Sequence, residues 1–184
     1  FRYSFWLFPE AKPEQLKPPP ALHDCPIDQR IGLFSMDFTL SPEHQEFADS
    51  VARFARDKLA PGALERAHSP HYPWETAKLL SEQGLLGITF PEEDGGQGGT
   101  LMHAVLAIQQ VALACPKSAD IVQAGNFGPI RTFVEYATPE QKERFLPDLL
   151  AGKKLISLGM TEPDAGSAVT ELKTSATQDG DDYL

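Results

Sequence analysis

The sequence predicts a mainly α-helical fold, in which a bundle of helices is followed by the first strands of a β domain. Helical periodicity with capping and stop signals recurs from Ser41 to Gly152. After Lys154 the pattern changes to a strand-length apolar run and then to a hairpin signal. Because two strands form at best a marginal sheet on their own, we expect the β domain to be incomplete within these 184 residues.

The composition predicts a soluble globular protein. Hydrophobic residues make up 41% of the chain, and no apolar run approaches the roughly 20 residues that a membrane span needs. A net charge of -10 and a pI near 4.9 disfavour general nucleic-acid binding, which needs a basic face. Cys25 and Cys115 have neither CxxC nor Cys/His ligand spacing, so we expect no metal site, no disulfide framework and a reduced intracellular setting.

Residues 1–35 differ from the rest of the chain. The stretch AKPEQLKPPPALHDCPIDQR is rich in proline and has no helical or strand periodicity, so we predict an irregular or extended tail. The opening FRYSFWLF is too short for a signal peptide, and acids follow it. We therefore expect Met36 to be the natural start or the domain boundary, and a bacterial cytoplasm rather than a mitochondrial matrix as the location.

The helical domain, residues 36–154, begins with an amphipathic helix. Ser41 is suited to its N-cap and Pro42 to its first helical position. The apolar positions that follow recur close to the 3.6-residue period, and they are Phe47, Val51, Phe54 and Leu59. One face of this helix is therefore predicted to lie in the core.

Two further helices are separated by a glycine-rich loop. The second helix is expected over 74–83, entered through Pro73 and ended by Gly84. The loop LLGITFPEEDGGQGGT then leads to Thr100, which caps a third helix of about fifteen residues, LMHAVLAIQQVALAC. Since this third helix is apolar nearly all round, we predict that it is the central, buried one.

Prolines and a capping box mark the remaining helices. Residues 118–136 continue the helical pattern with a break at Gly128-Pro129. The tetrad TPEQ, starting at Thr138, is a capping box that opens another helix. Pro147 is expected to bend this helix and Gly152 to end it.

Residues 155–184 are predicted to begin the β domain. The run LISLGMT, which starts at Leu155, has the length and composition of a strand. The segments on either side of Asp179-Gly180 are expected to pair as a hairpin, because Asp-Gly is a strong hairpin-turn signal.

Several motifs have both a structural and a functional interpretation. The loop DGGQGGT fits neither GxGxxG nor GxxxxGK[ST], so a plain helix-helix turn is favoured over a phosphate site. His103, inside the apolar third helix, is favoured as a hydrogen-bonded core residue over a metal ligand or a base. Ser167 has no GxSxG context and no obvious His partner, so no nucleophile is predicted.

The stretch GMTEPDAGSAVTELKT, from Gly159 to Thr174, carries the strongest candidate site. After the predicted strand it offers backbone amides, the hydroxyls of Thr161 and Ser167, and a glycine turn at Gly166. Such neutral donors suit a ring carbonyl, a ring nitrogen and a phosphate. The alternative is a plain turn between strands, solvated by its acids. The residues alone leave both interpretations open.

The same stretch resembles the signature of the flavin-dependent acyl-CoA dehydrogenases, and the resemblance extends over most of the chain from Met36 to Leu184. It includes FTLSPEHQEFADSVARFARDKLAP, GLLGITFPEEDGGQGG, GNFGP and TPEQKERFLPDLLAG, in the family's order. It implies an N-terminal helical bundle of the acyl-CoA dehydrogenase type, followed here by the first strands of a truncated middle β-barrel domain.

The resemblance implies FAD-dependent α,β-dehydrogenation of an acyl-CoA thioester, with an electron-transferring flavoprotein as acceptor and a homotetramer at full length. By position, the cofactor-binding residues would be Leu158, Gly159, Met160, Thr161, Gly166 and Ser167, and Ser167 would also reach the substrate. The family's catalytic base is a glutamate of a C-terminal domain, so no catalytic residue is assigned and Glu162 is interpreted as a structural acid of the turn. These residues alone are then expected to be inactive and to hold FAD weakly or not at all.

Alternatives stay open at this point. An acyl-CoA oxidase or a nitroalkane-oxidising flavoenzyme would share this part of the fold, and a non-catalytic helical interaction module is the alternative from another class. One residue departs from the family's pattern, which has Asp where this chain has Ala168. We expect Asp164 to replace that carboxylate in part as an acceptor of turn amides.

Overall fold

The structure is a computed structural model that describes residues 38–180 and 182–183. The chain divides between Thr39 and Leu40, and the second unit, residues 40–184, holds all the helices and strands described. The predicted tail over 1–35, with Met36, lies outside the described residues.

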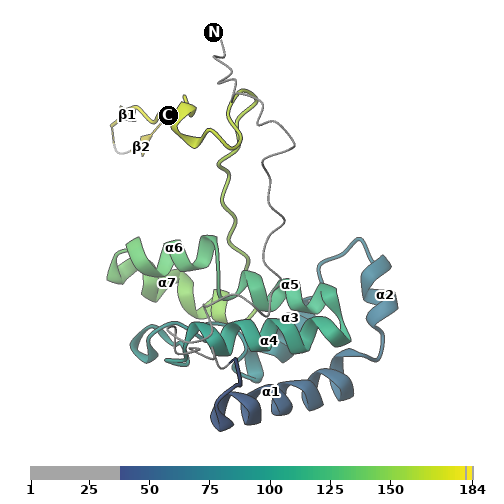
Figure 1. The fold of residues 1–184 in the computed structure, drawn as a ribbon. Helices are drawn as coiled ribbons and strands as arrows, with labels where there is room; N and C mark the ends of the chain where they lie inside the picture. The colour runs from purple at the N-terminus through teal and green to yellow at the C-terminus, as the bar shows by residue number, and fades with distance from the viewer. Residues whose placement is uncertain (1–37, 181, 184) are drawn as a thin grey trace, which may run out of the picture. The chain divides into compact units, whose positions relative to one another are not determined.

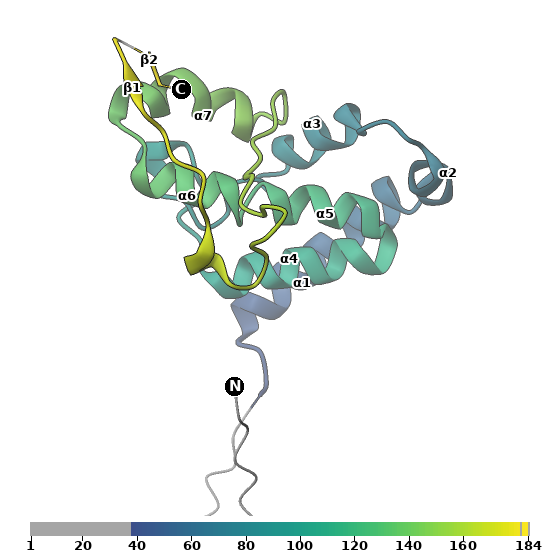
Figure 2. The same ribbon diagram turned by 90° about the horizontal axis from the view of Figure 1, so that it is seen from above.

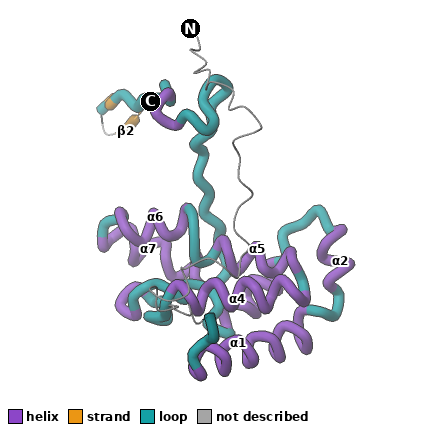
Figure 3. The backbone as a smooth tube through the Cα atoms, in the orientation of Figure 1, coloured by secondary structure: helices purple, strands orange, loops and turns teal. Residues whose placement is uncertain are grey.

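The described chain is mostly helical, and the part that follows the last α-helix is mostly loop (Figure 3). Its helices are α1 (Pro42–Phe54), continued by a π-helical turn (Ala55–Leu59), α2 (Ala63–His68), α3 (Trp74–Glu82), α4 (Leu101–Ala114), α5 (Pro116–Ala124), α6 (Pro129–Tyr136) and α7 (Pro139–Leu150). Two 3-10 turns cover Glu92–Asp94 and Val169–Glu171, and the strands are β1 (Gln178–Asp179) and β2 (Asp182–Tyr183). The predicted mainly α fold is confirmed.

Local side-chain chemistry sets where three of the helices begin. Ser41 Oγ accepts a hydrogen bond from the backbone N–H of His44 at 3.2 Å, and Pro42 occupies the first helical position. Thr100 and Thr138 cap α4 and α7 with capping boxes. These caps satisfy N–H groups that have no partner inside the helix, and all three predicted starts are confirmed.

Helix α4 lies between α1 and α5 in the main core (Figure 1). The buried cluster includes Val51, Ala55 and Leu59 from α1 and its continuation, Ala104, Ala107 and Val111 from α4, and Ile121 and Val122 from α5. Alanines on the inner face of α4 let the neighbouring helices approach closely. The apolar stripe predicted for the first helix therefore does face the core, with Phe47 and Phe54 packed at its edge.

Helix α4 is central, as predicted, but it is buried on its inner face only. Leu101, Val105 and Leu113 are 59%, 48% and 79% exposed, whereas Ala107 and Val111 are fully buried. The apolar composition of a helix shows that it favours burial, but the segments that cover it are set by the rest of the fold. Among the described residues, α1 and α5 cover the inner face of α4 and leave its outer face exposed.

Helices α6 and α7 lie side by side around a second, smaller core (Figure 2). This core consists of Phe90, Ile130, Val134, Leu146 and Leu149. Helix α6 begins at Pro129, and α7 contains Pro147 and ends at Leu150, close to the predicted stop. Gly152 has φ 66°, and an added Cβ would lie 2.7 Å from the carbonyl carbon of Ala77, so this turn requires glycine.

The glycine-rich loop between α3 and α4 is folded on itself. The backbone N–H groups of Gly96, Gln97 and Gly98 donate to the carbonyl oxygens of Pro91, Gly87 and Phe90, and that of Gly99 donates to Ile88. Because these amides are engaged within the loop, they are not available to a phosphate. The predicted helix-helix turn is confirmed.

Asn126 fastens this loop to α5 from a fully buried position. Its Oδ1 accepts a hydrogen bond from the backbone N–H of Ile88 at 2.6 Å. Its Nδ2 donates to the carbonyl oxygens of Leu85 at 2.9 Å and Val122 at 2.7 Å. One side chain thus satisfies three buried backbone groups from two separate segments.

Residues 155–161 do not form the predicted strand. They are not helical, and they pair with no strand among the described residues. A strand needs a neighbour for its N–H and C=O groups, which an apolar run cannot supply for itself. The predicted hairpin is confirmed in short form: β1 and β2 pair antiparallel with Asp179 opposite Asp182, and the turn begins at Gly180.

Candidate functional site

The candidate site is the segment from Leu158 to Ser167. Just before it, Ile156 packs against the second core of α6 and α7 and so ties the start of the segment to the helices. Leu158 and Met160 are 55% and 47% exposed. These two side chains give the site an uncovered apolar surface.

A tight turn follows this apolar stretch. The backbone N–H of Glu162 donates to the Ala165 carbonyl at 3.1 Å, and the N–H of Ala165 donates to the Glu162 carbonyl at 3.2 Å. The two residues form an antiparallel bridge. Since Thr161 and Gly166 flank this bridge on its two arms, the turn brings the Thr161 end of the site next to the Gly166-Ser167 end.

The Glu162 carboxylate clamps a later part of the chain to this turn. Its Oε2 accepts a hydrogen bond from the backbone N–H of Lys173 at 2.9 Å, and its Oε1 accepts one from that of Thr174 at 2.8 Å. Hydrogen bonding from the Thr174 side chain and from these two backbone N–H groups holds the pKa of Glu162 below its usual value. The interpretation of Glu162 as a structural acid is confirmed.

The other polar groups of the site are free to bind a ligand. Among the described residues, the exposed hydroxyls of Thr161 and Ser167 and the N–H groups of 158–161 make no hydrogen bond within the chain. A Cβ added at Gly159 or Gly166 would meet no atom within 4 Å, so there is space beside the backbone. Apolar side chains next to unpaired neutral donors fit a planar ring with a polar edge, such as the isoalloxazine of FAD.

Two parts of the site differ from the sequence-based expectation. The sequence pattern assigns no role to Lys173 and Thr174, because no periodic or motif signal links them to an acid eleven and twelve residues earlier. Asp164 was expected to accept turn amides in place of the carboxylate missing at Ala168. That expectation is wrong within the described chain, where Asp164 faces the Lys173 ammonium at 3.9 Å and Glu162 accepts the amides.

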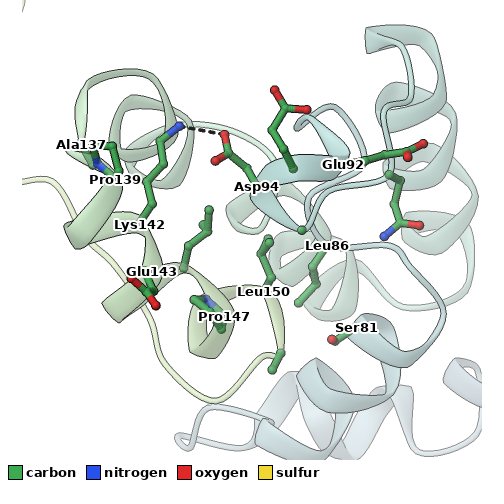
Figure 4. Close-up of a pocket in the computed structure, with 15 residues that line it drawn as sticks. Ser81, Leu86, Glu92, Asp94, Ala137, Pro139, Lys142, Glu143, Pro147 and Leu150 are labelled. Carbon is green, nitrogen blue, oxygen red and sulfur yellow. Dashed lines mark hydrogen bonds and ion pairs between the residues drawn. The ribbon is translucent and has the colours of Figure 1, made fainter.

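A separate cavity of about 820 Å³ lies between the Glu92–Asp94 turn and α7 (Figure 4). Its apolar lining includes Leu146 and Leu150. Acidic side chains prevail in its polar lining, which comprises Ser81, Glu92, Glu93, Asp94, Gln97, Lys142 and Glu143. Lys142 Nζ lies 2.8 Å from Asp94 Oδ2, so this cation is already paired and the cavity is unsuited to a phosphate.

His103 joins α1 to α4 rather than forming a reactive site. Its Nδ1 lies 2.8 Å from Thr100 Oγ1, and its ring centroid lies 4.7 Å from that of His44 and 5.0 Å from that of Phe47. The predicted hydrogen bond is present, but His103 is half-buried at the edge of the core and not inside it. Over residues 38–180 and 182–183, no cluster of His, Cys, Asp or Glu is arranged to hold a metal ion, and no helix has the length and apolarity to cross a bilayer.

Comparison with known proteins identifies relatives of this chain. It is 36% identical over 149 residues to the probable acyl-CoA dehydrogenase YngJ of Bacillus subtilis (strain 168), a match that covers 81% of this chain and 39% of that protein. It is 35% identical over 146 residues to the 3-sulfinopropanoyl-CoA desulfinase of Paraburkholderia xenovorans (strain LB400), covering 79% and 37% respectively. The chain thus spans less than two-fifths of the length of these relatives.

The fold has solved counterparts as well. A glutaryl-CoA dehydrogenase from Mycobacterium smegmatis, in complex with FADH2, matches the structure with a TM-score of 0.71 at 28% identity, over 82% of this chain and 39% of that one. Residues 41–153, more than half of the chain, match the family model described as the N-terminal domain of acyl-CoA dehydrogenases. The chain therefore belongs to the acyl-CoA dehydrogenase family.

Proposed function

We propose that this chain carries one wall of the flavin site of an FAD-dependent acyl-CoA dehydrogenase, which oxidises an acyl-CoA thioester between its α and β carbons. The clamped turn supports this most, because it holds apolar surface next to unpaired neutral donors. Membership of the family supports it too, as does the FADH2 in the related Mycobacterium smegmatis structure.

In this proposal the segment from Leu158 to Thr161 lies along the isoalloxazine ring. The exposed Leu158 and Met160 side chains cover apolar ring surface, because that contact removes both partners from water. The N–H and hydroxyl of Thr161 donate to the nitrogen and carbonyl edge of the ring. Gly159 leaves room for this approach, since no atom would oppose even an added Cβ there.

The second arm of the turn would serve the phosphates and the substrate. Gly166 allows the backbone to come close to the pyrophosphate, because it has no side chain to keep an anion away. Ser167 adds a hydroxyl donor there and reaches the acyl-CoA as well. We propose both contacts from the position of these residues beside the bridge.

When bound, FAD supplies the acceptor for the hydride that leaves the β carbon. The donors at Thr161 stabilise negative charge at the ring edge without changing their own protonation. The apolar residues before Thr161 exclude water from the ring. We propose no base for the α proton among the described residues, because Glu162, the acid that follows Thr161 in the sequence, is engaged with two backbone amides.

The proposal extends to partners. On family membership we propose an electron-transferring flavoprotein as electron acceptor and a homotetramer as the assembly. One relative is named a desulfinase, which is a different reaction, so family membership does not identify the acyl group of the substrate. An assay must identify it. We expect residues 1–184 by themselves to be inactive and to bind FAD weakly.

Protein expressed from the complete coding sequence tests this function. We expect its flavin absorption band to bleach without oxygen when the right member of a panel of acyl-CoA thioesters is added, 3-sulfinopropanoyl-CoA included. Reoxidation by an electron-transferring flavoprotein but not by oxygen would distinguish the dehydrogenase from the oxidase alternative. A flavin that no acyl-CoA reduces, or a protein without flavin, would contradict the proposal.

A further inference from the structure

We propose that Glu162 is a positioning residue for the flavin: its carboxylate holds residues 173–174 against the turn and so fixes the direction of the donors at Thr161 and Ser167. The inference rests on the proposed function, because the direction of these donors matters only if the segment holds a flavin. It assigns Glu162 no part in the chemical step itself.

Burial of apolar side chains does not hold this segment in shape. Between residues 157 and 180, only Ala165 is buried, and its side chain is a single methyl group. The favourable free energy of burial scales with the apolar area removed from water, so one methyl group contributes little. Polar contacts therefore set the conformation of the turn.

The Glu162 carboxylate provides the polar contact that joins distant parts of the segment. Its two oxygens accept from two consecutive amides, those of Lys173 and Thr174, at 2.9 and 2.8 Å. Hydrogen bonds to an ionised acceptor are short and stronger than neutral ones, and a pair of them fixes an angle as well as a distance. The neighbouring Asp164–Lys173 ion pair is weaker, since its side chains are 84% and 77% exposed and 3.9 Å apart.

This clamp acts on the donors through the backbone. Thr161 directly precedes Glu162, and Ser167 lies two residues beyond Ala165, the bridge partner of Glu162. Neither hydroxyl is held by a hydrogen bond of its own among the described residues. The direction of both donors therefore follows the backbone that the carboxylate fixes. Glu162 is not part of either hydrophobic core of the helices, so the helical part should keep its fold when this carboxylate is replaced.

The variant that tests the clamp is Glu162→Gln. Glutamine keeps the size of the side chain and one acceptor oxygen, but its NH2 group cannot accept, so one of the two amides loses its partner. Glu171→Gln is the matched control, because it makes the same charge change in the same segment on an exposed side chain that bonds to no described residue. Both variants are expected to keep the helical circular dichroism of the wild type.

The first measurement needs no flavin. Amide hydrogen exchange by NMR on the 184-residue chain should show at least one of the Lys173 and Thr174 amides exchanging roughly tenfold faster in Glu162→Gln, because that amide loses its acceptor. Glu171→Gln should leave their exchange unchanged. Unchanged exchange in Glu162→Gln would overturn the clamp, whatever the chain binds.

The second measurement uses protein from the complete coding sequence and determines the Kd for FAD and the visible flavin spectrum. We expect Glu162→Gln to weaken FAD binding roughly tenfold and to shift the flavin band, because donors at the ring edge set its energy, and Glu171→Gln to do neither. Faster amide exchange with unchanged affinity and spectrum would overturn the positioning role and leave the proposed function intact. A wild-type protein that binds no FAD would overturn both.

Discussion

Replacing Asn126 tests how the helical part is held together, because this side chain joins α5 to the loop that precedes α4. It is fully buried and makes three hydrogen bonds, one accepted from Ile88 and two donated to Leu85 and Val122. Asn126→Ala leaves one buried N–H and two buried carbonyl groups without this partner. Each such group costs about 1–3 kcal/mol, so for the three groups together we expect a loss of at least about 3 kcal/mol.

That loss is large compared with the total free energy of unfolding of a domain. Domains of this size are typically stable by about 5–15 kcal/mol, so the variant should lose a substantial part of its stability. Urea unfolding followed by far-UV circular dichroism gives the difference in free energy. Gln123→Ala, on the exposed side of α5, is the control and should change stability by less than about 0.5 kcal/mol.

A second replacement at the same site separates hydrogen bonding from packing. Asn126→Leu restores the lost volume but offers no donor or acceptor, so we expect it to be as destabilising as Asn126→Ala. If leucine recovers the wild-type stability, or if alanine costs less than about 1 kcal/mol, the three hydrogen bonds are not what fastens the loop and the reasoning is refuted.

Three further predictions follow from single contacts. Gly96→Ala should destabilise the chain by on the order of 3 kcal/mol in urea unfolding, since the added Cβ would lie 2.2 Å from the Phe90 carbonyl oxygen; a loss below about 1 kcal/mol would show that the loop adapts freely. Thr138→Ala should lower the free energy of unfolding by about 1 kcal/mol, because it removes the cap of α7. Hydrogen exchange should become faster in the first turn of α7, and unaltered exchange there would contradict the capping role. A hydrogen bond and charge attraction from Lys154 lower the pKa of Asp148. This contact therefore stabilises the fold above the ordinary aspartate pKa, and its contribution is lost as pH falls through the lowered value. Lys154→Ala should raise the Asp148 pKa in an NMR titration, and an unmoved pKa would refute the pairing.

Features set by neighbouring residues were predictable from the sequence. Ser41, Thr100 and Thr138 were recognised as N-caps because a cap acts on amides two or three positions away, and each has its predicted hydrogen bond. Glu162 was recognised as a structural acid of its turn, although its partners were not.

Features set by distant segments were not predictable in this way. Asn126 bonds to Ile88 across 38 positions, and nothing in the local pattern near either residue marks the pair. The predicted strand over 155–161 failed for the same reason, because pairing depends on a partner and not on the apolar run alone. The exposed side of α4 shows that an apolar helix favours burial, but its composition does not tell which segment covers it.

The central claim is that residues 158–167 contact a flavin, and a crystal structure of the protein from the complete coding sequence with FAD bound tests it most directly. We predict Met160 against the isoalloxazine ring and the Thr161 hydroxyl or N–H within ~3.2 Å of the polar edge of that ring. A flavin bound elsewhere, with these residues far from it, would contradict the account.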